Sequence, residues 1–168
     1  MVADAKIPSS TAGLASLLVM AKDQYHQLLI WHLPADSSTE AVDRVAKELR
    51  VADLNLNLEL SRRLLELPQR QWPHQVSTLL RDIIKAAGSS GVLLSHIELL
   101  FDKGLRVDPM RCLQQVARHQ PVIAIWPGEV SEQYLLYAEP DHPEYMRYPR
   151  KDYLVFSDVP LTSTKPST

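Results

Sequence analysis

The residues with the clearest chemical meaning lie in one loop, which reads His32-Leu33-Pro34-Ala35-Asp36-Ser37-Ser38-Thr39 and joins an apolar segment to a helical one. Loops that hold nucleotide phosphates at such a place read G-x-x-x-x-G-K-S/T. Their glycines free backbone N–H groups, and their lysine reaches the outer phosphates. Here His32 and Ser37 occupy the glycine positions, Ser38 occupies the lysine position, and Asp36 adds a negative charge. Only Thr39 keeps a residue type that can contact magnesium.

The start of the following helix gives a second reason to expect no phosphate at this loop. A helix N-terminus attracts anions because its first N–H groups lack partners. Ser37 and Glu40 stand in the S-x-x-E spacing of a capping box, in which each side chain accepts a hydrogen bond from the other residue's backbone N–H. We therefore expect no cofactor, neither ATP nor Mg²⁺, at this loop.

A second position also lacks the expected chemistry. In nucleotide hydrolases with such a loop, an acidic residue at the end of another buried strand holds the magnesium ion. The run GVLLSHIE at residues 91–98 places Ser95 where that acid would stand, with Glu98 shortly after it. A serine cannot supply the negative charge that this hard cation requires. We interpret Glu98 as a solvated residue at a strand end, with a displaced catalytic base as the alternative.

Two pairs of basic residues are candidates for contacts with phosphate or with a partner protein. Arg62 and Arg63 are adjacent and can contact a partner's nucleotide or the DNA backbone. Arg81 and Lys85 are four residues apart, so they share one face of a predicted helix. The alternative for both pairs, which we prefer, is an ordinary solvated helix face. The six histidines and the one cysteine show no metal-ligand spacing, and we expect no metal site.

Composition limits the class of protein. The 168 residues are enough for one domain, and their net charge of −2 excludes a basic field that covers the whole molecule. A single cysteine excludes an internal disulfide, and no apolar run approaches the ~20 residues of a membrane span. We predict a cytoplasmic protein with one domain over residues 11–160 and loose tails at 1–10 and 161–168.

Hydrophobic periodicity predicts alternating strands and helices. The predicted strands are 27–31, 51–57, 91–96, 122–126, 133–138 and 153–156. The predicted helices are 11–24, 41–50, 58–67, 75–87 and 108–118, and a Pro-rich connection covers 139–150. Alternation of this kind is typical of the α/β class, with a mostly parallel sheet flanked by helices in a single domain.

Four blocks carry a resemblance to a known family: NLNLELSRRLLELP at 55–68, GVLLSHIELLFD at 91–102, LRVDPMRCLQQVARHQPVIAIWPGEV at 105–130 and YAEPDHPEYMRYP at 137–149. Together they resemble BrxF, the small P-loop-containing subunit of type 3 bacteriophage exclusion (BREX) systems. The likeness covers about residues 15–156. It implies a P-loop NTPase core of the RecA/AAA type, within a complex that methylates host DNA and restricts phage DNA.

The resemblance also shows where this chain departs from the family. Members usually carry an intact glycine-lysine loop and an acid near Ser95, so ATP hydrolysis does not carry over. We expect a non-enzymatic accessory subunit of the defence complex. Its expected partners are a larger ATPase or a methyltransferase, with DNA reached through the complex, no membrane, and self-association left open. The alternatives are an ATP-binding subunit that uses Thr39 and Glu98, or a DNA-binding module that uses the arginines.

Overall fold

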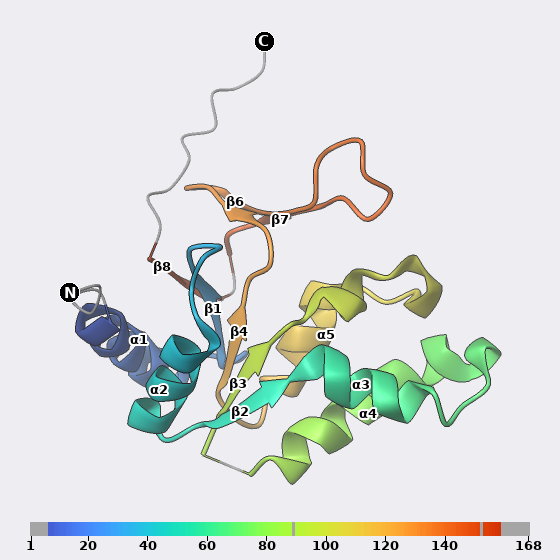
Figure 1. The fold of residues 1–168 in the computed structure, drawn as a ribbon, viewed down its shortest axis with the longest axis horizontal. Coiled ribbons are helices and arrows are strands. Elements are labelled where there is room, and N and C mark those ends of the chain that lie inside the picture. Colours follow the sequence, from blue (N-terminus) through green and yellow to red (C-terminus); the bar gives the residue numbers. More distant parts are fainter. Residues whose placement is uncertain (1–6, 89, 152, 159–168) are drawn as a thin grey trace.

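The computed structural model describes residues 7–88, 90–151 and 153–158. Five parallel strands form the main sheet, in the spatial order β2 (Ala52–Asn55), β3 (Val92–Ser95), β4 (Val122–Ile125), β1 (Leu28–His32) and β8 (Leu154–Ser157). One face is covered by α1 (Ile7–Ala21) and α2 (Thr39–Leu49). The other is covered by α3 (Leu56–Leu64), α4 (Trp72–Ala86) and α5 (Pro109–Val116) (Figure 1). The predicted α/β class, with a mostly parallel sheet in one compact domain, is confirmed.

The central strands are apolar except for His32 and Ser95 at the carboxyl ends of β1 and β3, because both of their faces are buried. Side chains alternate between the two faces of a strand, so Leu28 and Ile30 join the core beneath α3, α4 and α5. Leu29 and Trp31 join the core beneath α1 and α2. Burial of each such side chain stabilises the fold by about 1.5–3 kcal/mol. Within the described residues, short 3-10 helices also lie at Gln69–Gln71, Glu98–Phe101 and Lys103–Leu105.

The segment after β4 differs most from the sequence-based expectation. The predicted connection over 139–150 contains a strand, β7 (Met146–Pro149), which pairs with β6 (Tyr134–Tyr137). β6 also pairs with β5 (Glu129–Val130), so these strands form a separate antiparallel sheet. The prediction of a loop was wrong because prolines can stand in short edge strands, where one side of the backbone needs no hydrogen-bonding partner.

The small sheet is fixed to the domain by aromatic side chains. The ring of Tyr137 stacks on that of Phe101 with centroids 3.7 Å apart, and Phe101 meets Trp126 edge to face at 5.6 Å. The indole Nε1 of Trp126 donates to the carbonyl of Leu136 at 2.9 Å. Gly128 permits this close approach, because a Cβ there would collide with the same carbonyl. The hairpin is therefore held rigidly beside the end of β4.

The N-terminal end of the domain differs from the sequence-based prediction. Residues 7–10 form the first turn of α1, although the sequence placed them in the N-terminal tail. Gly13 of α1 lies directly against the ring of Phe156 in β8, where any side chain would collide. The predicted tail at 161–168 lies outside the described residues. Within the described part of the chain, no helix is both long and apolar enough to cross a membrane.

Candidate functional site: the carboxyl edge of the sheet

The segments that follow β1, β3 and β4 meet at the carboxyl edge of the main sheet and enclose a cavity of about 560 Å³. We term it the carboxyl-edge cavity. Ligands of open α/β sheets bind outside the carboxyl ends of the strands, and the volume falls within the usual range for small-molecule sites. Of the loop residues singled out in the sequence, His32, Ser37, Ser38 and Thr39 line this cavity. The cavity therefore lies beside the loop at 32–39, which the sequence places where a phosphate-binding loop would stand but without the residues that hold phosphate.

Part of the loop is hydrogen-bonded within itself and to the start of α2. The N–H of Ser37 donates to the carbonyl of Pro34 at 3.0 Å and closes a turn, and proline has no N–H to offer. Ser38 is the N-cap of α2, and its Oγ accepts from the N–H of Ala41 at 3.1 Å. The capping box predicted for Ser37 and Glu40 was therefore wrong by one residue. The turn engages Ser37, and Ser38 takes the extended conformation that a cap requires.

His32 adds no positive charge to the loop. Its ring is half-buried, and its Nδ1 lies 2.9 Å from Oγ of Ser157 on β8. Burial lowers the pKa of His32 and outweighs the opposing influence of Glu129. The imidazole is consequently mostly neutral at pH 7, and His32 brings no positive charge that would attract an anion.

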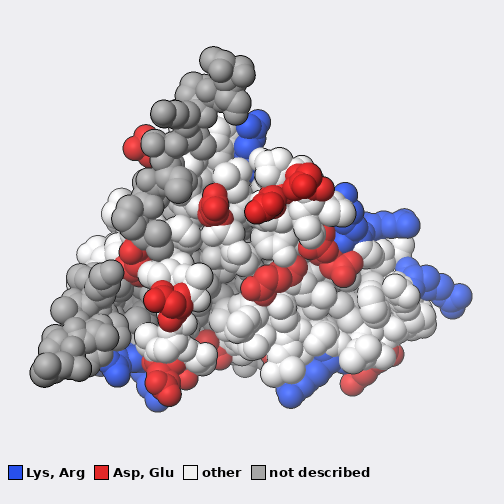
Figure 2. Space-filling view, turned by 45° about the horizontal axis from the view of Figure 1, so that its top comes forward, with Lys and Arg blue, Asp and Glu red and all other residues white. Residues whose placement is uncertain are grey.

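The charged side chains that line the cavity are acidic. They are Asp43, Asp53, Glu98 and Glu129, and none of the described residues that line it is Lys or Arg. Figure 2, in which the carboxyl edge comes forward, shows acidic groups over the middle of this end and basic groups mostly toward its margins. Asp36 was expected to supply the repulsion, but it is exposed and does not line the cavity.

Two of these acids, Asp43 on α2 and Asp53 on β2, lie next to each other. Partial burial raises the pKa of Asp53 to about 6, and further causes are the hydrogen bond that protonated Asp53 donates to Asp43 and the negative charge of Asp43. Asp53 already resists ionisation beside Asp43, so a further negative charge at this edge of the sheet is unfavourable. A phosphate group placed here would meet no compensating cation.

Ser95 and Glu98 occupy different environments at the end of β3. The hydroxyl of Ser95 donates to the carbonyl of Leu54 at 3.2 Å, so it serves the neighbouring strand. Glu98 is half-buried and accepts from the side-chain amide of Asn57 at 2.9 Å. The same Asn57 accepts from the backbone N–H of Leu99 at 2.8 Å. Glu98 is thus held in place, whereas the sequence interpretation had it freely solvated.

The structure separates the two basic pairs that the sequence singled out. Arg62 is mostly exposed and pairs with Glu59 on the same helix at 3.5 Å. Neither Arg62 nor Arg63 lines the carboxyl-edge cavity. Arg81 and Lys85, by contrast, line a second hollow between α4 and α5. The two pairs therefore lie in different surroundings, with Arg62 and Arg63 on α3 and with Arg81 and Lys85 at the second hollow.

Sequence reasoning missed several residues that shape the cavity, namely Asp43, Asp53, Asn57 and Glu129. Asp53 stands within the predicted strand 51–57, and Asn57 is the last residue of that predicted strand. Polar residues at the carboxyl ends of parallel strands are usual positions for site residues, and that signal was present. The described residues contain no group of three or more His, Cys, Asp or Glu side chains placed to hold a metal ion.

Comparisons with known proteins add no identification. No protein-family model matches the chain, and a search of the curated proteins finds none similar to it. The function must therefore be argued from the site and from the sequence blocks themselves.

Proposed function

We propose that this chain is a non-enzymatic accessory subunit of a BREX-type anti-phage defence complex, built on a P-loop NTPase-like fold. The observation that carries the proposal is the carboxyl-edge cavity, which keeps the position of a nucleotide site without its chemistry. Its turn uses the N–H of Ser37 internally, Ser38 caps the helix, and its charged walls are acidic. Transition-state charge in phosphoryl transfer is stabilised by cations, and the described lining offers none.

The strand order supports the P-loop-like part of the proposal. β1 lies between β4 and β8, which are the fourth and fifth strands of the main sheet along the chain. RecA- and AAA-type sheets place their first strand in the same way. In dinucleotide-binding doubly wound sheets, the first strand lies between the second and the fourth. The order here therefore favours the former class.

The spatial grouping of the four sequence blocks supports the family part of the proposal. Tyr137 of the last block stacks on Phe101 of the second, and the hydroxyl of Tyr148 donates to Asp108 of the third at 3.2 Å. The first block joins through Asn57, which bonds to Glu98. Segments that are distant in sequence thus form one connected unit, as expected if the resemblance reflects a shared fold.

The direct test is co-purification of the full chain with the larger ATPase and the methyltransferase of a BREX-type system, expressed together with it. We expect the tagged chain to recover a larger ATPase or a methyltransferase in constant ratio, with or without Mg-ATP. The variants Thr39→Ala and Glu98→Gln, which alter only the cavity, should recover the same partners in the same amounts. A chain that stays monodisperse and alone in such lysates would contradict the proposal.

A second function is favoured by one observation, which is that Thr39 and the held carboxylate of Glu98 both line the same cavity. That arrangement supports an ATP-binding subunit with an unconventional loop. This alternative predicts radiolabelled ATP binding that is lost in Thr39→Ala and in Glu98→Gln. Absence of binding at every magnesium concentration would eliminate it.

A further inference from the structure

The second hollow lies between α4 and the end of α5 and has a volume of about 610 Å³. We term it the α4–α5 groove. Apolar side chains line its floor, with Leu80 and Ile84 contributed by α4 and Val116 by α5. Gln120 joins the two walls, because its amide donates to the carbonyl of Gly88 at 3.0 Å. The groove is therefore a built feature of the fold.

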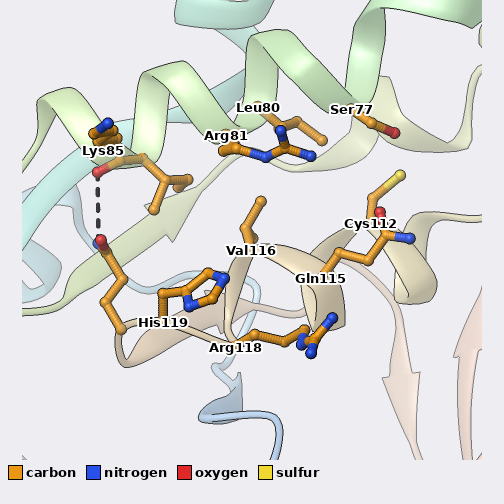
Figure 3. Close-up of a pocket in the computed structure, with 11 residues that line it drawn as sticks. Ser77, Leu80, Arg81, Lys85, Cys112, Gln115, Val116, Arg118 and His119 are labelled. Carbon is orange, nitrogen blue, oxygen red and sulfur yellow. Dashed lines mark hydrogen bonds between the residues drawn. The ribbon is translucent and has the colours of Figure 1, made fainter.

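Cations stand on both sides of this groove. Arg81 and Lys85 come from α4, and Arg118 follows α5, with the imidazole of His119 next to it. Figure 3 shows Arg81 and Arg118 on opposite sides, with Val116 between them. None of the described residues that line the groove is Asp or Glu. In a molecule whose net charge is −2, this is a local basic surface that the total charge conceals.

An exposed aromatic ring lies beside one of these cations. The guanidinium carbon of Arg118 lies 4.8 Å from the ring centroid of Tyr25, a residue that is 69% exposed. Tyr25 lies between α1 and β1 and is not among the residues that line the groove, so its ring stands beyond the groove itself. Arginine guanidinium groups match phosphate geometry, and exposed aromatic rings stack on nucleobases.

The groove offers binding contacts and no reactive nucleophile. Cys112 lines one end, but it is buried, and burial raises the pKa of its thiol to about 11. The thiol is therefore protonated at pH 7 and unreactive. Core packing, as the residue type predicts, accounts for this cysteine.

We propose that the α4–α5 groove binds a single strand of nucleic acid, with Arg81, Lys85 and Arg118 on successive phosphates and Tyr25 against a base. Cations on both walls and a ring beyond them fit an extended polyanion that carries an aromatic base on every charged unit better than they fit an acidic peptide, whose Asp and Glu side chains carry no ring. The groove is separate from the carboxyl-edge cavity, so the inference does not depend on the proposed function.

The test is fluorescence anisotropy of the purified full chain with a labelled oligothymidylate at several salt concentrations. Three phosphate contacts on a single strand predict a slope of log K against log salt of about −2. The double variant Arg81→Glu/Arg118→Glu should weaken binding by about tenfold or more at low salt. Arg81→Gln/Arg118→Gln should weaken it less and provides a milder change that preserves folding. Tyr25→Ala should reduce affinity without changing the salt slope.

The matched control is Arg62→Glu/Arg63→Glu, which makes the same change of charge on a different helix. We expect it to leave oligothymidylate binding within about twofold, since exposed charges away from the contact are screened. Equal losses in both double variants would overturn the proposal, as would absence of binding. Tighter binding of duplex DNA, or equal binding of polyglutamate with the same loss in Arg81→Gln/Arg118→Gln, would also overturn it. Each protein's melting temperature establishes that it is folded.

Discussion

The carboxyl-edge cavity and the α4–α5 groove are hollows of similar size, about 560 and 610 Å³, with opposite charge. The first lies where parallel α/β sheets bind ligands, yet four carboxylates and no described cation line it. The second lies between two helices, where topology gives no reason to expect a ligand, and it carries three cations and a histidine. The fold provides the hollow, and the side chains decide what it can hold.

The comparison also explains why the total charge is a poor guide to partners here. The acidic residues of the cavity lie on α2, on β2 and after β3 and β4, and the groove cations lie on α4 and after α5. The net charge of −2 sums 18 basic and 20 acidic residues and so hides both groups. Each surface nevertheless has its own local potential, since charges beyond a Debye length of about 8 Å are largely screened from one another.

The largest effect is expected from removal of the aromatic wall beside the cavity. Trp126 is buried and contacts Phe101 and Tyr148. Trp126→Ala should lower the free energy of unfolding by about 3–5 kcal/mol, because it removes ring contacts and leaves a void. Urea unfolding measures the loss. Trp126→Phe keeps a ring and should lose clearly less. A loss below about 1 kcal/mol in Trp126→Ala would contradict the placement of Trp126 in the core.

The second effect tests whether Glu98 is held in place or merely solvated. Asn57→Ala removes the amide that serves both Glu98 and the N–H of Leu99, and it leaves that N–H without its partner. We expect the free energy of unfolding to fall by about 1–3 kcal/mol. Asn57→Asp keeps the acceptor for Leu99 but places a carboxylate against Glu98, so its loss should be smaller at low pH than at pH 8. Unchanged stability in both variants would contradict this description.

The third effect concerns the acidic character of the cavity. The pKa of Asp53 is raised to about 6, so the folded state binds a proton more tightly than the unfolded state does. This contribution to stability is present below about pH 4 and is lost as the pH rises through 6. Asp53→Asn should therefore raise the melting temperature at pH 7.5, and the gain should vanish toward pH 4. A gain that is the same at every pH would contradict the raised pKa of Asp53.

The smallest effect is expected on the basic residues outside the groove. Arg62 pairs with Glu59 on an exposed helix face, and such pairs contribute little because water screens them. Arg62→Gln should change the free energy of unfolding by less than about 0.5 kcal/mol. Urea unfolding measures the change. A larger change would mean that Arg62 stabilises the fold and is not an ordinary solvated residue.

Local patterns in the sequence predict much of the fold. The apolar runs at β3 and β4 indicate strands buried on both faces, and both strands are present. Asp108 before Pro109 predicts a helix start, and the Asp108 carboxylate accepts from the N–H of Arg111 at 3.1 Å as an N-cap does. These elements follow from residue type and spacing within a few positions of the chain.

The remaining features depend on contacts between distant segments. Ser37 and Ser38 are equally good caps by type, and the turn closed at Pro34 decides between them. Arg118 joins Arg81 only because α4 and α5 pack together, which no local pattern specifies. The same holds for β7, whose pairing with β6 creates a strand from a proline-rich segment.

The central claim is that the loop after β1 does not accept a triphosphate, and thermal unfolding of the full chain with Mg-ATP tests it most directly. Ligand at about 100 times its dissociation constant would stabilise the protein by about 2.7 kcal/mol. For a domain of this size, that would raise the melting temperature by about 5–10 °C. We predict a change below about 1 °C at millimolar Mg-ATP. A rise of several degrees that disappears in Thr39→Ala would contradict the claim.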